Sequence, residues 1–207
     1  EKIFLFCDPR LKRIFEEKYK YLHFITNKND HKNQKFESKL PLGSLPKYFR
    51  NTEEEFHSNQ PPQGSNQIKN SSVKRSCQKK LIGLSWNTKN KQFGPERNIS
   101  LNQFYQIFQN KHYEFLNLQY GNCDQEINEL ENKLQRKIFV DCKNDNTNDL
   151  EGLAENIKKC DLVISIDNST AHLSGFLNQK TFLLLPLVSD WRWQEDRIDT
   201  PWYPSIK

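Results

Sequence analysis

The chain has 207 residues, of which 35% are hydrophobic and 28% charged, and its formal net charge is +5. This length can build one mid-sized domain or parts of two, and no stretch approaches the roughly 20 apolar residues of a transmembrane helix. The chain opens at Glu1 without a basic, apolar leader and contains no methionine, so we expect a fragment of a longer, non-secreted protein. Its five cysteines are scattered without metal-type or redox spacing, so we expect free thiols in a reducing cytoplasm rather than disulfides or zinc.

The positive charge lies in the first 80 residues, whereas the remaining residues carry a small excess of Asp and Glu. A nucleic-acid surface would explain such an excess. However, the lysines between Lys12 and Lys47 are mixed with Glu and Asn and are not regularly interleaved with stacking aromatics. We therefore interpret this part as a solvated surface and expect no nucleic-acid partner.

The first part of the chain predicts one strand, helix and strand step. Residues 2–8 form a short apolar run that Asp-Pro closes, apolar residues at helical spacing follow over 11–19, and a second apolar run covers 21–26. Residues 40–50 contain turn-forming residues that are flanked by apolar residues. Residues 57–79 are polar and punctuated by Pro and Gly, which is typical of a linker or a surface crossing.

From residue 80 onward, apolar runs alternate regularly with amphipathic segments. The predicted strands are 81–86, 113–121, 137–141, 161–167 and 181–187, and the predicted helices are 99–108, 123–136, 149–160 and 169–177. This alternation predicts a Rossmann-like α/β layer, a parallel sheet with helices on both faces. Right-handed crossovers place every strand-to-helix loop at the carboxyl edge of such a sheet, where these folds bind ligands.

The stretch DLVISIDNSTAHLSG combines a buried strand with the start of a helix. Asp167 is expected at the carboxyl tip of the strand, and Asn168 or Ser169 can cap the helix by accepting from its first amides. Ser169, Thr170 and His172 would then remain outward beside unpaired amides, where the helix dipole favours an anion by about 0.3–1 kcal/mol. We therefore predict a phosphate-binding site. The alternative is an ordinary helix cap beside a surface or half-buried histidine. Neither GxGxxG nor GxxxxGK[ST] occurs, which argues against the classical dinucleotide and P-loop sites.

Three further loops are predicted at the same edge. Their candidate residues are Lys89, Lys91 and Arg97 after the first strand, Gln119 and Gly121 at the end of the second, and the aromatic loop 189–204. The basic residues can neutralise a diphosphate or a departing nucleotide, or simply form an exposed basic loop. The side-chain amide of Gln119 can form hydrogen bonds with a base or a sugar hydroxyl, or it can simply lie in the loop where the strand ends. The aromatic rings can stack on a base or sugar, although packing over the sheet edge is the favoured reading.

Several of these motifs occur together in one order and spacing. These motifs are LIGLSWN, RNISL, FLNLQYG, DLVISIDNSTAHLSG, LLLP and DWRW followed by TPWYP. Together they resemble the glycosyltransferase domain found behind tetratricopeptide repeats in many bacterial proteins. That domain is related to the ADP-heptose lipopolysaccharide heptosyltransferases and, more distantly, to the O-linked N-acetylglucosamine transferases. The resemblance covers most of residues 80–207, and residues 1–56 look like the end of the family's first Rossmann-like domain.

The resemblance implies a GT-B architecture, in which two Rossmann-like domains face each other across a cleft and the first is only partly present here. Residues 1–56 would belong to the acceptor-side domain, 57–79 to a linker, and 80–207 to the nucleotide-sugar-binding domain. A basic residue in the loop after the first strand of the second domain helps the nucleotide to leave in this family, and we assign that catalytic role to Lys91 and Arg97. The nucleotide-sugar-binding residues implied are Lys89, Gln119, Gly121, Asp167, Asn168, Ser169, Thr170 and His172. No metal or cofactor is required, because amides and a basic side chain compensate the charge.

The sequence therefore predicts a cytoplasmic, metal-independent glycosyltransferase or a piece of one. It would move a sugar from a nucleotide-diphosphate donor to a glycan or protein acceptor, with tetratricopeptide repeats in the same full-length chain. The catalytic base is expected outside this fragment. The alternative is a non-catalytic module of a repeat protein that binds a nucleotide sugar or a glycan.

Overall fold

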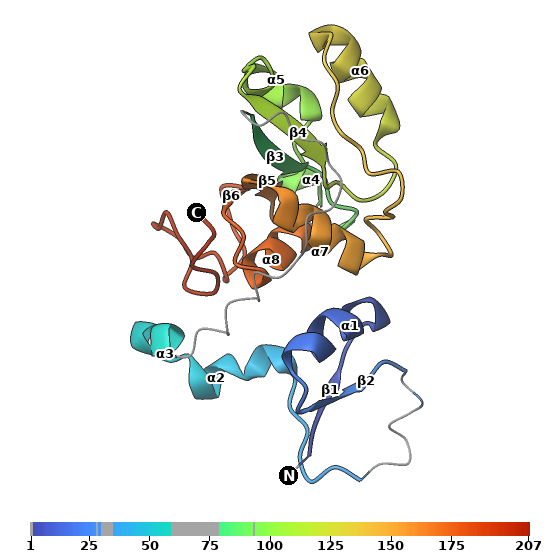
Figure 1. The fold of residues 1–207 in the computed structure, drawn as a ribbon. Helices are drawn as coiled ribbons and strands as arrows, with labels where there is room; N and C mark the ends of the chain where they lie inside the picture. Colours follow the sequence, from blue (N-terminus) through green and yellow to red (C-terminus); the bar gives the residue numbers. More distant parts are fainter. Residues whose placement is uncertain (1, 28, 30–34, 59–78, 93) are drawn as a thin grey trace. The chain divides into compact units, whose positions relative to one another are not determined.

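The computed structural model describes residues 2–27, 29, 35–58, 79–92 and 94–207. The chain divides into two compact units, Glu1–Gln63 and Gly64–Lys207, and each contains a parallel sheet with helices (Figure 1). The predicted α/β class with parallel sheets is therefore confirmed. The predicted linker over 57–79 lies outside the described residues except for the end of one helix and Lys79.

Unit 1 is built on a two-stranded parallel sheet. Its elements are β1 Ile3–Phe6, α1 Pro9–Lys18, β2 Leu22–Ile25, the 3-10 turn η1 Leu42–Ser44, α2 Pro46–Phe49 and α3 Glu53–Ser58. Helix α1 begins after Asp8, whose side chain accepts a hydrogen bond from Arg10 N at 2.9 Å, and proline occupies its first position. Ile25 is the only buried hydrophobic side chain among the described residues of this unit. A two-stranded sheet with so small a core gains little stability from burial.

Unit 2 contains a four-stranded, entirely parallel sheet. Its elements are β3 Lys80–Ser85, α4 Gly94–Arg97, the 3-10 turn η2 Leu101–Phe104, α5 Tyr105–Phe108, β4 Tyr113–Asn117, α6 Asp124–Leu134, α7 Leu150–Lys159, β5 Leu162–Ile166, α8 Ser169–Phe176 and β6 Thr181–Leu184. The strand order is β4-β3-β5-β6. The chain therefore runs outward from β3 to β4 and then returns to the other side of β3. This reversal between β3 and β5 is a topological switch point, the place where open parallel sheets bind ligands.

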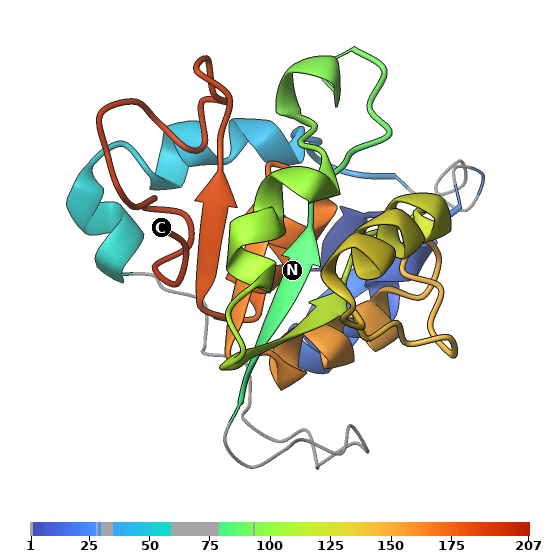
Figure 2. The same ribbon diagram turned by 90° about the horizontal axis from the view of Figure 1, so that it is seen from above.

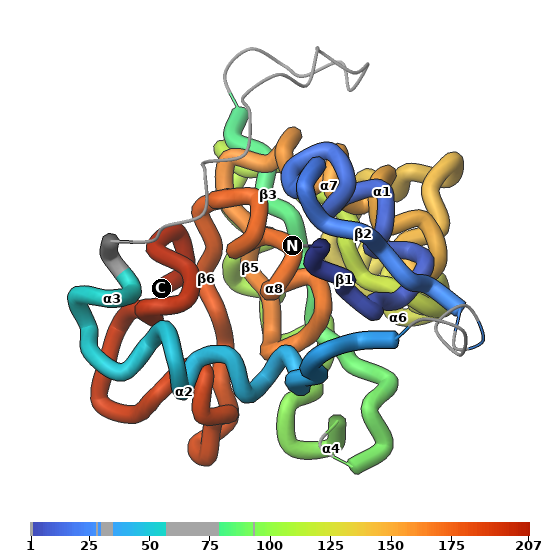
Figure 3. The backbone as a smooth tube through the Cα atoms, turned by 90° about the horizontal axis from the view of Figure 1, so that it is seen from below, coloured from blue at the N-terminus to red at the C-terminus, as the bar shows by residue number. Residues whose placement is uncertain are grey.

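Helices cover both faces of this sheet. Ile82, Leu84 and Trp86 belong to the main hydrophobic cluster. The segments η2, α5 and α6 cover this face of the sheet (Figure 2). On the other face, α7 and α8 pack across the strands (Figure 3). Gly83 of β3 lies on that second face, where a β-carbon would overlap Leu118 and Cys160. The alternation along β3 thus explains why a glycine stands in the middle of a buried strand.

The predicted strand at 137–141 is wrong, because this segment forms only a single parallel bridge. Phe139 exchanges backbone hydrogen bonds with β4, donating to Phe115 O and accepting from Asn117 N, both at 2.8 Å. Ile138 is buried, but Phe139 and its neighbour Val140 are 40% and 44% exposed. The apolar run therefore lies against the sheet at one point instead of continuing as a fifth strand.

Three other boundaries differ from the sequence pattern. The strand expected over 113–121 ends at Asn117. The helix expected over 99–108 starts at Leu101 as a 3-10 turn, and its α-helical part is only Tyr105–Phe108. The strand expected over 181–187 ends at Leu184, since Pro186 cannot donate to a ladder and Leu187 is fully exposed. No helix within the described ranges is both long and apolar enough to cross a membrane.

Candidate functional site

Polar side chains gather at the carboxyl ends of the three strands β3, β4 and β5. The buried ones are Ser85, Asn117, Gln119, Asp167, Asn168 and Thr170. Buried polar groups need hydrogen-bond partners, so each of them is held in a defined orientation or carries an unmet hydrogen bond. Because this edge contains the switch point between β3 and β5, it is the candidate site.

Asn168 caps helix α8 and also ties β5 to the end of β3. Its Oδ1 accepts hydrogen bonds from Thr170 N at 2.9 Å and Ala171 N at 3.3 Å. Its Nδ2 donates to Ser85 Oγ at 2.8 Å and to Asn87 O at 3.3 Å. The side chain is only 6% exposed. The sequence predicted Asn168 or Ser169 as the helix cap, and the structure has Asn168, whose amide is fully used inside the protein.

This cap narrows the predicted phosphate-binding site. The amides of Thr170 and Ala171 are the ones that donate to the capping side chain of Asn168, so they are not available to an anion. The Thr170 side chain, expected to point outward, is completely buried, and its Oγ1 has no hydrogen-bond partner within the described structure. Ser169 is exposed, as expected, and its amide pairs with no described residue. In the first turn of α8, an anion could therefore bind only the amide and hydroxyl of Ser169, unless the Asn168 side chain moved away from the amides of Thr170 and Ala171.

Replacing Asn168 tests the two roles of its side chain separately. Asn168→Ala removes both the cap and the link to Ser85, and we expect it to lower the free energy of unfolding by about 2–3 kcal/mol. Asn168→Ser keeps a capping oxygen but cannot reach Ser85, so the expected loss is about 1 kcal/mol. Urea denaturation of both variants measures the difference. Equal losses would contradict a separate capping contribution.

Gln119 connects the loops that follow β3 and β4. Its Oε1 accepts from Trp86 N at 2.9 Å and from Asn87 N at 2.8 Å. Its Nε2 donates to Asn87 O at 3.0 Å and Tyr120 O at 2.9 Å. The side chain is 4% exposed. The amide that the sequence analysis offered to a base or sugar is therefore engaged with backbone groups, and Gln119 shapes the site from within.

Lys89 and Gly121 lie against each other across the same two loops. Gly121 has a positive φ of 83°, and a β-carbon there would come within 2.8 Å of Lys89 Nζ. Its amide donates to Thr147 Oγ1 at 3.2 Å. Lys91 is exposed further along the loop and forms no ion pair with a described residue. The structure therefore brings Lys89 and Gly121 together but leaves Lys91 in solvent.

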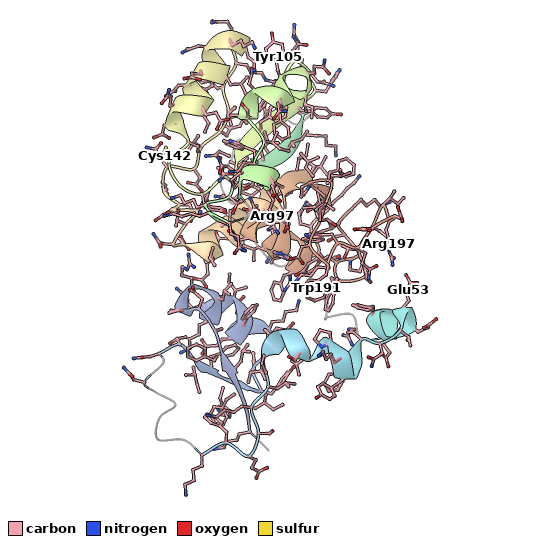
Figure 4. The ribbon with its side chains drawn as sticks, turned by 180° about the vertical axis from the view of Figure 1, so that it is seen from behind. Glu53, Arg97, Tyr105, Cys142, Trp191 and Arg197 are labelled. Carbon is pink, nitrogen blue, oxygen red and sulfur yellow. The ribbon has the colours of Figure 1, made fainter. Side chains whose placement is uncertain are left out.

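Arg97 of α4, which is labelled in Figure 4, pairs with Asp167 at the tip of β5. Arg97 Nη1 lies 2.9 Å from Asp167 Oδ2, although the N–H is not aligned for a hydrogen bond. The Asp167 side chain is 3% exposed and that of Arg97 is 19% exposed. The two opposite charges largely cancel, so Arg97 adds less positive potential to the edge than its sequence position suggested.

His172 is held between α8 and the segment that follows β6. Its ring stacks on Trp193 with centroids 5.0 Å apart, and its Nδ1 lies 3.2 Å from the hydroxyl of Tyr203. Tyr203 reaches this position because it packs on Gly175, where a β-carbon would overlap its ring. Trp193 and Tyr203 are the site residues that sequence reasoning did not assign. Their signal was the aromatic loop itself, for which the sequence analysis left stacking on a ligand and packing over the sheet edge open. In the structure, Trp193 and Tyr203 pack against His172 and Gly175 of α8.

The pKa of His172 is lowered from its ordinary value. Burial is the main cause, nearby Arg192 and Arg97 act in the same direction, and Asp167 and Asp190 oppose them. The lowered pKa favours the neutral form of His172 at pH 7. Its contact with Asp167, 3.7 Å from Nε2 to Oδ1, is accordingly not an ion pair.

The other half of the aromatic loop faces solvent. Trp191, labelled in Figure 4, is 53% exposed and meets Trp202 edge to face at 5.5 Å between centroids. The guanidinium of Arg192 lies 4.4 Å from the Trp191 ring. The loop is thus divided into a packed half around His172 and an exposed half around Trp191.

The edge offers an anion a limited set of groups. Lys89 and Lys91 supply exposed positive charge, and Ser169 supplies an exposed amide and hydroxyl. His172, whose side chain is 37% exposed, supplies a neutral ring N–H. Within the described ranges, no group of three or more His, Cys, Asp or Glu is arranged to hold a metal ion.

Comparison with known proteins gives one partial similarity. No protein-family model matches the chain, and no solved structure matches it. The chain is 31% identical over 132 residues to Protein FlbA of Caulobacter vibrioides, strain ATCC 19089 / CIP 103742 / CB 15. The match covers 61% of this chain and 21% of FlbA, so the chain spans about a fifth of that relative's length. This similarity does not by itself assign the chain to a family.

Proposed function

We propose that the chain is part of a GT-B glycosyltransferase that uses a nucleotide-diphosphate sugar, with unit 2 as the donor-binding domain and unit 1 as part of the acceptor-side domain. The observation that carries this proposal is the meeting of distant motif residues at one sheet edge. Lys89 packs against Gly121. Arg97 pairs with Asp167. These residues come from three different loops, and the edge that they share contains the switch point of a parallel sheet.

In the proposed reaction, the bond between the sugar's anomeric carbon and the β-phosphate oxygen breaks, and a bond from an acceptor oxygen to that carbon forms. The electron pair of the broken bond stays on the nucleotide diphosphate, and the acceptor proton goes to a base that we do not assign to the described residues. Lys89 and Lys91 would meet the departing negative charge, and Ser169 would donate a hydrogen bond to a phosphate oxygen. Asn168 and Gln119 hold the loops in place without touching the donor. We place this metal-independent activity in the cytoplasm, within a full-length chain that also carries tetratricopeptide repeats.

The two lysines provide the test of donor binding. We expect Lys89→Ala combined with Lys91→Ala to weaken binding of UDP or ADP by about five- to tenfold, because two charge contacts to the diphosphate are lost. Isothermal titration calorimetry measures the affinity. A matched control is Lys111→Ala with Lys180→Ala, which removes the same charge at the amino ends of β4 and β6. An equal loss in the control, or unchanged affinity in the first variant, would reject the site.

One observation favours a second function, a module that binds the nucleotide sugar without transferring it. Asp167 is buried and paired with Arg97, and His172 is held by Trp193 and Tyr203. Neither of these acid–base groups of the β5–α8 turn is placed to take a proton from an acceptor. Measuring nucleotide release from UDP-sugars and ADP-sugars by the full-length protein distinguishes the two functions, since binding without turnover would assign the module.

A further inference from the structure

Tyr203 and Asp167 contact opposite nitrogens of the His172 ring. The hydroxyl of Tyr203 lies 3.2 Å from Nδ1, and Oδ1 of Asp167 lies 3.7 Å from Nε2. Trp193 covers one ring face at an interplanar angle of 23°. Gly175, one turn further along α8, provides the space that the Tyr203 ring occupies. The imidazole is therefore oriented by three neighbours, two of which come from the segment after β6.

These contacts select one protonation form of the ring. A neutral histidine carries one N–H, and an ionised carboxylate can only accept. The tautomer with the proton on Nε2 directs its N–H toward Asp167 and leaves Nδ1 to accept from the hydroxyl of Tyr203. The opposite tautomer would place the Nε2 lone pair against the carboxylate. The distance of 3.7 Å is too long for a full hydrogen bond, so the Nε2–H keeps the capacity to donate to another oxygen.

We propose that Tyr203 is a positioning residue for His172: together with Asp167, which faces Nε2, it holds the ring as the Nε2–H tautomer so that this N–H can donate to a phosphate oxygen of the sugar donor. The ligand-binding part of this proposal rests on the proposed function, whereas the orientation of the ring does not. The His172 side chain is 37% exposed, so part of the ring is open to a ligand. In this form His172 is a hydrogen-bond donor and not a general base, since Nε2 carries the proton and Nδ1 is occupied.

Nitrogen NMR of the whole chain tests the orientation directly. Two-bond ¹⁵N–¹H spectra at pH 7.5 identify which ring nitrogen carries the proton, and the His172→Gln variant assigns the signal among the five histidines. We expect an Nε2–H signal in the wild type and a mixture of tautomers, or broadened signals, in Tyr203→Phe, which keeps the packed ring but loses the hydroxyl. Tyr120→Phe is the matched control, because it removes a hydroxyl that bonds Thr88 Oγ1 at 3.0 Å instead. An Nδ1–H signal in the wild type, or a spectrum unchanged by Tyr203→Phe, would overturn the proposal.

A double-mutant cycle then tests whether Tyr203 acts through His172. We expect Tyr203→Phe to weaken UDP or ADP binding by about three- to tenfold in the wild-type background and by less than about twofold in the His172→Gln background. Losses that multiply would show an independent structural role and would overturn the positioning role. If the wild type binds neither nucleotide while the Nε2–H signal and its change are observed, the proposed function fails and the positioning of His172 by Tyr203 stands.

Discussion

Replacing Asp167 with alanine is expected to lower the free energy of unfolding by about 3 kcal/mol, because it removes the buried carboxylate that lies against the guanidinium of Arg97. The Arg97 side chain is 19% exposed, so solvent can replace the lost carboxylate only in part. Chemical denaturation measures the change as a shift of the unfolding midpoint at constant slope. The loss should exceed that of any exposed ion pair in unit 2.

Two controls separate the charge pair from general damage at Asp167. Asp199→Ala breaks an exposed pair with Arg197, 2.8 Å from Oδ1 to Nε, and should cost several-fold less. The double variant Asp167→Ala with Arg97→Ala should cost clearly less than the sum of the two single variants, because each single variant already removes the interaction between the two charges. Additive losses would show that the two side chains are not energetically coupled.

Replacing Phe115 with alanine is expected to cost about 3–5 kcal/mol, the largest stability effect that we predict. Phe115 lies in β4 and is 1% exposed, with its ring centroid 4.3 Å from that of Phe108. The substitution would leave a cavity in the cluster between the sheet and η2, α5 and α6. Thermal or urea unfolding followed by circular dichroism provides the measurement.

The matched control for Phe115 is Phe182, which lies in β6 of the same sheet but is 43% exposed. Phe182→Ala removes the same atoms from a position that water already reaches, so its expected cost is about 1 kcal/mol or less. If both variants lost the same stability, the assignment of the hydrophobic core to the α5 and α6 face would be contradicted.

Hydrophobic periodicity predicted most of the elements because burial determines both the pattern and the fold. The apolar run of β5 and the helix start at Ser169 fell where the sequence indicated. The pattern failed at residues 137–141. This segment has the apolar composition of a buried strand, but only one of its sides is buried in the structure. It also failed to predict α4, because a four-residue helix that begins with Gly-Pro has no measurable period.

The candidate site was predictable in position but not in detail. Topology rules alone indicate that the loops bearing Lys89, Gln119 and Asp167 meet at one edge. They do not reveal whether a polar side chain binds a ligand or serves a neighbouring loop. That choice depends on three-dimensional contacts such as those of Gln119 with the backbone of Asn87. The contact between His172 and Tyr203 joins residues 31 positions apart and has no local sequence signal.

The outermost strands of the sheet in unit 2 each have an irregular segment along their free side. Phe139 bonds to the main chain of β4, while Ser205 and Lys207 bond to that of β6 at 2.8–3.0 Å. Main-chain groups that are already bonded cannot serve as a template for a strand from another molecule. Pairing of another strand at these bonded positions would therefore require the covering segment to detach first, so two stretches that are not themselves strands limit edge-to-edge association of this sheet.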